Sequence, residues 1–174
     1  MMVFQQLAVL PLVLICTSAF ATEKVIMINA INDSGIGSVI GNIKFSDSEN
    51  GLKITSSLKG LTPGLHGLHI HSNPICDTAI KDGKPVAGLA AGGHYDPHSS
   101  NKHEGPTGAG HYGDLPALSV DANGEANNSI TSPRLKLADI MNRAVIIHEG
   151  GDNYSDSPKP LGGGAGRIAC GIIK

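Results

Sequence analysis

Tryptophan is absent from this chain of 174 residues, and three tyrosines and three phenylalanines are its only aromatic residues. Basic residues form no run and the formal net charge is −2, so we expect no nucleic-acid partner, because phosphate binding requires clustered lysine and arginine. Glycine (23 residues) and proline (10 residues) are frequent. Such a composition is typical of short strands joined by turns and long loops, and the length fits a single domain.

The one long apolar stretch, residues 7–20, is too short to span a bilayer comfortably and ends in the small-x-small sequence Ala19-Phe20-Ala21. We therefore predict that residues 1–21 are a secretory signal peptide, that residues 22–174 are the mature domain, and that the chain has no membrane span. Lipid attachment at Cys16 is disfavoured, because Ile15 stands where a lipoprotein signal has a small residue.

Cysteine is scarce, with three residues in the chain. Removal of the signal peptide takes Cys16 away and leaves Cys76 and Cys170. Disulfides persist in exported proteins, so we expect these two cysteines to be bonded to each other. The alternative is two separate buried thiols.

Apolar residues recur with a period of two along most of the mature chain, which is the pattern of half-buried strands. The pattern predicts eight strands, at residues 25–31, 39–45, 52–58, 65–71, 118–122, 125–131, 143–148 and 167–173. Asn123-Gly124 predicts a tight turn between two of them, and only residues 135–142 suggest a short helix. We therefore predict an all-β protein, an eight-stranded antiparallel sandwich or barrel.

Two stretches, residues 72–116 and 149–166, interrupt this pattern and are rich in glycine, proline, aspartate and histidine. Loops of this length without secondary structure of their own are usually functional or disordered. The chain has eight histidines, and many of them lie in or beside these stretches. We therefore interpret both as functional loops.

The segment HGLHIH at residues 66–71 combines strand alternation with three histidines. Alternation places Leu68 towards the core and His69 and His71 on the opposite face, where two imidazoles can bind one metal ion. His148 ends another apolar strand and could be a third ligand. His66 shares the parity of Leu68, so we expect it to lie on the core side and to bond to the backbone.

The loop at residues 72–116 contains a second group of metal-binding residue types. His94, His103, His111 and Asp114 follow one another at spacings of nine, eight and three residues, which fits loop ligands that wrap around an ion. Three imidazoles and a carboxylate suit tetrahedral zinc, whereas an all-imidazole set suits copper. His98 fits neither set, and we expect it to be exposed to solvent.

Seven motifs occur in order along the mature chain: HGLHIH (66–71), GGHYDP (92–97), KHEGP (102–106), GHYGDLP (110–116), HEGGDN (148–153), PLGGGAGR (160–167) and ACGIIK (169–174). Together they resemble the copper–zinc superoxide dismutases, in particular their bacterial periplasmic branch. The resemblance implies a Greek-key β-barrel or flattened sandwich. It also implies a periplasmic enzyme that disproportionates superoxide to oxygen and hydrogen peroxide in antioxidant defence of the cell envelope.

The resemblance implies one copper ion and one zinc ion per subunit. The copper ligands would be His69, His71, His94 and His148, and the zinc ligands His94, His103, His111 and Asp114. His94 would bridge the two ions as an imidazolate and take part in catalysis.

Further roles are implied outside the ligand sets. Asp152 would hydrogen-bond to His69 and His103, Arg167 would dock the superoxide anion beside the copper, and Cys76 and Cys170 would form the family disulfide. Lys59, Lys136 and Lys159 are candidates for steering superoxide, although ordinary surface charge is the alternative for all three. The family includes monomers and homodimers, so either state is expected.

Overall fold

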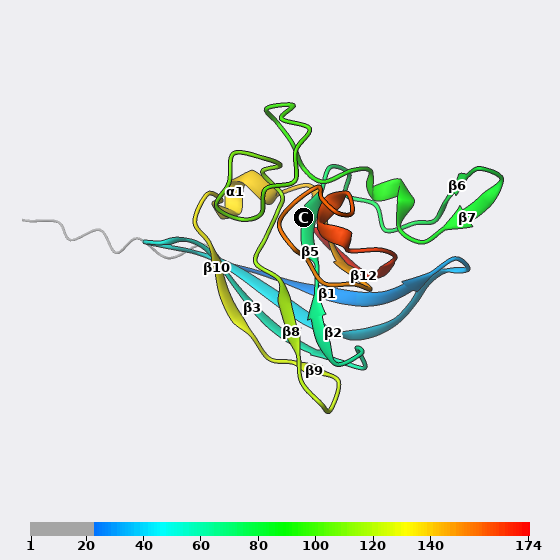
Figure 1. Cartoon of the computed structure of the whole chain (residues 1–174). Coiled ribbons are helices and arrows are strands. Elements are labelled where there is room, and N and C mark those ends of the chain that lie inside the picture. The colour runs from blue at the N-terminus through cyan, green and yellow to red at the C-terminus, as the bar shows by residue number, and fades with distance from the viewer. Residues whose placement is uncertain (1–22) are drawn as a thin grey trace, which may run out of the picture.

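The computed structural model describes residues 23–174, so the predicted signal peptide and Cys16 lie outside the described residues. Its main element is an eight-stranded antiparallel sheet (Figure 1). The strands are β1 (Glu23–Asn32), β2 (Gly35–Ser48), β3 (Gly51–Lys59), β5 (Leu68–His71), β9 (Glu125–Ala126), β10 (Ser129–Ser132), β11 (Arg143–His148) and β12 (Arg167–Ile173). They lie in the order β10-β3-β2-β1-β12-β11-β5, with β9 also paired to β3.

A short second ladder, β4 (Gly64–His66) with β8 (Leu118–Val120), joins the two ends of this sheet. β4 leads into β5, and β8 leads into β9 through a turn in which the N–H of Gly124 donates to the carbonyl of Asp121 (3.1 Å). The chain passes from the β10–β3 end of the sheet to the β11–β5 end twice: once after β3, and again after β10 through α1 (Leu137–Ile140). This arrangement confirms the predicted Greek-key barrel, the short helix and the turn at Asn123-Gly124.

The structure corrects two predicted strands, each of which is split in two. Residues 65–71 form β4 and β5, separated at Gly67, whose N–H donates to Gly150 and whose carbonyl accepts from the N–H of His148. Residues 125–131 form β9 and the start of β10, separated at Asn128, whose side chain bonds to the backbone of Ser119. In both places the backbone hydrogen bonds change partner and interrupt the ladder.

The two predicted loops also contain regular structure. Residues 72–116 include a hairpin, β6 (Ala79–Lys81) with β7 (Lys84–Val86), and a 3-10 turn, η1 (Leu89–Ala91). Residues 149–166 include a second 3-10 turn, η2 (Leu161–Gly163). The hairpin turns at Asp82-Gly83, and both residues have positive φ, as an Asp-Gly turn requires. The dipeptide Asp82-Gly83 is a sequence signal for a hairpin, and the prediction of a loop at residues 72–116 did not take it into account.

Alternating side chains from the strands fill the barrel interior. Leu52, Ile54 and Leu58 all point inwards from β3, as their spacing predicts. On β1, Ile28 lies in the barrel core, whereas Ile31 belongs to a second cluster outside it. Ile31 is three residues beyond Ile28, so strand alternation places the two side chains on opposite faces of β1. The β1–β2 register shifts between them, and the extra residues of these bulges lie in β2.

The second cluster lies between the outer face of β11–β12 and the start of the loop at residues 72–116. Its buried members include Ala144, Ile146, Cys76 and Cys170. The two cysteines form a disulfide with a Cα–Cα distance of 5.8 Å, which confirms the predicted pairing. The bond attaches this loop to β12. Among residues 23–174 there is no helix with the length and apolar character needed to cross a membrane.

Candidate metal centre

β5 carries two of the candidate ligands on its outer face. Leu68 and Ile70 point into the barrel core, and His69 and His71 alternate with them towards the covering loops, as predicted. All four side chains are buried: Leu68 and Ile70 lie in the core, and the two long loops gather around β5 and β12 and cover His69 and His71 (Figure 1). His148 lies at the end of β11, the strand that pairs with β5.

The loop at residues 72–116 runs beside β5 at two points and brings further ligands with it. Isolated bridges place His94 opposite His71 and Asp114 opposite His69. Gly113 allows the second approach, since a Cβ at this position would lie 2.3 Å from a carbonyl oxygen of β5. Residues distant in sequence therefore meet because segments of the loop form short β-bridges to one strand.

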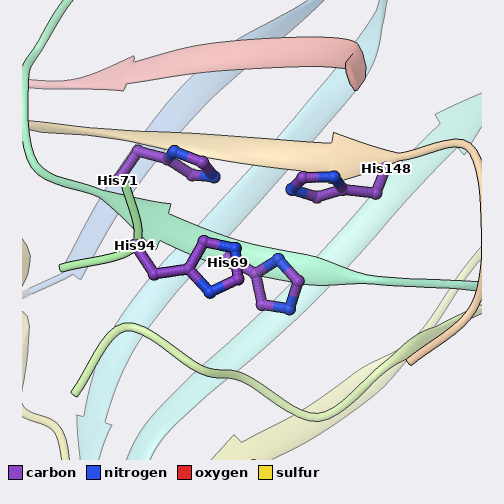
Figure 2. A group of neighbouring side chains, drawn as sticks. All are labelled: His69, His71, His94 and His148. Atoms are coloured by element: carbon purple, nitrogen blue, oxygen red, sulfur yellow. The ribbon is translucent and has the colours of Figure 1, made fainter. Parts of the chain in front are cut away.

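Four histidines converge beside β5 and β11. Figure 2 shows the rings of His69 and His71 from β5, His148 from β11 and His94 from the loop facing a common space. Each offers one nitrogen, and these four atoms all lie within 4.8 Å of one another. Such a cluster of imidazoles, all buried, is a natural copper site.

Hydrogen bonds leave one ring nitrogen of each β5 histidine free. His69 donates from Nε2 to Asp152 (2.8 Å), and His71 donates from Nδ1 to the Gly92 carbonyl (2.9 Å). Within the described part of the chain, the other nitrogens, His69 Nδ1 and His71 Nε2, have no hydrogen-bond partner. The same holds for both ring nitrogens of His148 and for His94 Nε2. Buried polar atoms without partners are costly, and a metal ion would satisfy them.

The second group surrounds the carboxylate of Asp114. Its oxygens lie 2.9 Å from His94 Nδ1, 2.9 Å from His103 Nδ1 and 3.6 Å from His111 Nδ1. Ligand atoms of His69, His94, His103 and Asp114 lie within 4.8 Å of one another, so His111 lies just outside this tightest set. The residues fit a zinc ion, because three imidazoles and one carboxylate surround the same space.

His94 belongs to both groups through different atoms. Its Nε2 is one of the unpartnered nitrogens beside the other three histidines, and its Nδ1 lies beside Asp114. His69 also lies near both groups, but its Nε2 is occupied by Asp152, which leaves only Nδ1 for an ion. The geometry thus allows His94 to bind two ions at once.

The protonation of the two groups differs. Burial, followed by the neighbouring ring of His69, lowers the pKa of His94 to about 4 and that of His148 to about 2. Burial would also lower the pKa of His103, but the Asp114 and Asp152 carboxylates beside it raise that pKa to about 9. The four-histidine group is therefore neutral at pH 7 and ready to bind a cation, whereas a metal must displace a proton from His103.

Asp152 connects the two groups through hydrogen bonds to one histidine of each, His69 and His103. Its buried carboxylate accepts a hydrogen bond from His69 Nε2 through Oδ2 (2.8 Å) and another from His103 Nε2 through Oδ1 (2.7 Å). Burial raises the pKa of this carboxyl group, but the hydrogen bonds from His103 and His69 outweigh it and hold the pKa below its usual value. An ionised carboxylate only accepts, so it fixes the tautomer of both rings.

Arg167 lies half-buried at the start of β12, next to the four-histidine group. Its guanidinium donates to the carbonyls of Gly88 and Gly92, and the Gly92 carbonyl also accepts from His71. The Arg167 guanidinium and the candidate copper ligand His71 therefore bind the same carbonyl oxygen, that of Gly92. Gly92 belongs to the motif GGHYDP, but sequence reasoning did not predict its carbonyl as an acceptor, because a backbone acceptor leaves no side-chain signature.

The remaining predicted residues fall into two groups. His66 is buried and bonds to the backbone through Nδ1 with His148 (2.7 Å), and His98 is exposed, so both predictions are confirmed. Lys59, Lys136 and Lys159 are exposed. Of the three, Lys159 lines a hollow together with Asp152, Gly162 and Gly163.

The family model for copper/zinc superoxide dismutase matches residues 39–173. The chain belongs to the copper/zinc superoxide dismutase family. As a member of this family it is an oxidoreductase that disproportionates superoxide to oxygen and hydrogen peroxide, and copper and zinc are its metals.

Relatives and solved structures agree with the family model. The Escherichia coli K12 copper–zinc superoxide dismutase is 50% identical over 169 residues, which cover 97% of each chain. The enzyme of Brucella abortus superposes with a TM-score of 0.87 at 46% identity, over 88% of this chain and all of that one. The monomeric enzyme of Salmonella enterica superposes with a TM-score of 0.80 at 52% identity, over the same shares.

Proposed function

We propose that the four-histidine group, His69, His71, His94 and His148, holds the catalytic copper, and that His94, His103, His111 and Asp114 hold the zinc. The observation that carries this assignment is the position of His94, whose two ring nitrogens face the two groups. The unpartnered nitrogens on one side and the carboxylate on the other suit copper and zinc respectively.

His111 is assigned to zinc although His69 lies closer to the carboxylate group. His69 has a single free nitrogen, Nδ1, and the four-histidine group already uses it. The buried Nδ1 of His111 has no hydrogen-bond partner among the described residues and lies 3.6 Å from Asp114 Oδ1. It is the remaining nitrogen that can complete three imidazoles around Asp114.

When bound, copper supplies the one-electron reduction and oxidation that convert two superoxide anions and two protons into oxygen and hydrogen peroxide, while zinc keeps one oxidation state. The residues of the chain bind the anion and handle the proton. Arg167 supplies a permanent cation that superoxide can approach. Among residues 23–174, His94 Nε2 has no hydrogen-bond partner, so when it is not a ligand it can hold a proton and release it to the reduced substrate.

We further propose that residues 1–21 are cleaved after Ala21, without lipid attachment at Cys16, and that residues 22–174 work in the periplasm in defence of the cell envelope. The apolar leader, the disulfide and the bacterial relatives support this location. The similar Salmonella enzyme is described as monomeric, which favours a monomer over a homodimer. Mass spectrometry of the exported protein and its light scattering would test these points.

Anomalous diffraction at the copper and zinc absorption edges of the metal-loaded protein tests the ligand assignment. We expect a copper peak bound by the four-histidine group and a zinc peak bound by Asp114 with His94, His103 and His111. A zinc peak bound by His69 in place of His111, or two peaks that share no residue, would contradict the assignment.

A further inference from the structure

The loop that joins His103 to His111 has no helix or strand to give it shape. One backbone bond closes it, from the His111 N–H to the Lys102 carbonyl (2.8 Å), and Glu104 accepts from the N–H of Ala109 inside it (3.0 Å). Both histidines are buried beside Asp114. Something outside the loop must therefore keep the two side chains at a fixed separation.

Arg134 occupies the inside of this loop. It comes from the segment between β10 and α1, where the next residue, Leu135, is fully buried. Its guanidinium donates four hydrogen bonds to loop carbonyls: Nε to Pro106 (3.1 Å), NH1 to Gly110 (3.3 Å), and NH2 to Gly105 (3.0 Å) and to His111 (2.7 Å). One side chain thus binds both ends of the loop.

Tyr112 adds a second link between Arg134 and the loop. The Tyr112 hydroxyl donates to the carbonyl oxygen of Arg134, and the Arg134 Cζ lies 5.5 Å from the centre of the Tyr112 ring. The side chain of Arg134 is therefore restrained on its face as well as at its edges. A planar group with five donors in a fixed fork suits this task, because it can bind several converging carbonyls at once.

We propose that Arg134 is a positioning residue of the zinc site. It holds the carbonyls of residues 105, 106, 110 and 111 around one cation and so sets the separation of His103 and His111 before zinc binds. The shortest of its bonds is to the carbonyl of His111 itself, the candidate ligand that lies farthest from Asp114. This inference rests on the zinc set proposed above.

Zinc affinity of the copper-free protein, measured by competition with a chromophoric chelator, tests the proposal. Arg134→Gln should weaken zinc binding by roughly 10–100-fold, the usual range when a group that orients metal ligands is lost. Arg134→Lys should not restore it, because one ammonium group cannot reproduce the fork. Lys136→Gln removes an equal charge two residues away and should leave zinc affinity unchanged, because within the described residues the Lys136 ammonium group donates to the Ser48 carbonyl and not to the loop of residues 103–111.

Two further readouts separate positioning from general stability. The visible absorption of Co²⁺ bound in place of zinc should change in Arg134→Gln, while copper affinity of the zinc-free variant should stay as in the wild type. Unchanged zinc affinity in both Arg134 variants, or an equal loss of copper and zinc, would overturn the proposal. If Arg134→Gln does not fold, the same measurements on Arg134→Lys test the proposal, with the same loss of zinc affinity expected.

The ligand set can be tested alongside. If His111→Ala binds zinc as tightly as the wild type, the zinc assignment itself is wrong. If His111→Ala loses zinc but the Arg134 variants retain it, only the role of Arg134 fails.

Discussion

Replacement of Asp152 by alanine removes the carboxylate that joins the two metal groups. The side chain is fully buried and accepts hydrogen bonds of 2.8 Å from His69 and 2.7 Å from His103. Without it, two buried ring N–H groups lose their acceptor, and each ring can adopt the tautomer that turns a hydrogen towards the metal. We expect Asp152→Ala to weaken both copper and zinc binding.

The magnitude follows from one bond for each metal. A hydrogen bond to a charged group contributes about 1.5–3 kcal/mol. Since about 1.4 kcal/mol corresponds to a factor of ten in a binding constant, each metal should bind roughly 10–100-fold more weakly. Because the same residue supports both groups, the two losses should be of similar size.

The assay is a chelator competition for each metal separately, on protein freed of both. Asp121→Ala is the matched control, because the carboxylate of Asp121 also accepts two N–H groups, those of Asn123 and Glu125, but in an exposed turn between β8 and β9. The control should bind both metals as the wild type does. If Asp152→Ala also retained wild-type affinity for both, the coupling of the two groups through this carboxylate would be refuted.

Three further predictions concern copper, the disulfide and a glycine. His148→Ala should abolish superoxide removal and weaken copper binding while circular dichroism and zinc affinity stay unchanged; full activity would contradict the copper assignment. Alanine at both Cys76 and Cys170, which are separated by 94 residues, should cost roughly 4–5 kcal/mol and lower Tm by roughly 8–20 °C, and an unchanged melting curve would contradict it. Gly162→Ala places a Cβ 2.0 Å from Oδ1 of Asp152, the carboxylate that joins the two metal groups, and should weaken the binding of both metals. Gly83→Ala is its control, because Gly83 also has a positive φ but has open space around it, and this variant should leave both affinities unchanged.

Much of the fold could be predicted because strand alternation is strong in this chain. The inward set of β3, Leu52, Ile54 and Leu58, is confirmed, and the same rule places His69 and His71 on the outer face of β5. The disulfide followed from the cysteine count once a leader was assumed. These features depend on side-chain type and spacing, which the sequence displays directly.

Other features depend on backbone groups and could not be predicted from the sequence. The split at Gly67 and the register shifts between β1 and β2 arise from local hydrogen-bond partners and bulges, which interrupt the strand ladders without altering the periodic pattern of the sequence. The roles of Gly92 and Arg134 rest on carbonyl oxygens, which every residue has. Gly92 lies in the motif GGHYDP, but no motif shows which donors its carbonyl accepts from or that the Arg134 side chain binds loop carbonyls, and only the folded loop reveals these contacts.

The central claim is that the four-histidine group makes this chain a copper-dependent superoxide dismutase. Superoxide decay, followed by pulse radiolysis or stopped flow, should be compared for protein loaded with copper and zinc and for protein loaded with zinc alone. The account predicts rapid decay only in the copper-loaded form. Negligible decay in both forms, with one copper and one zinc bound per chain, would contradict it and point to metal storage or delivery instead.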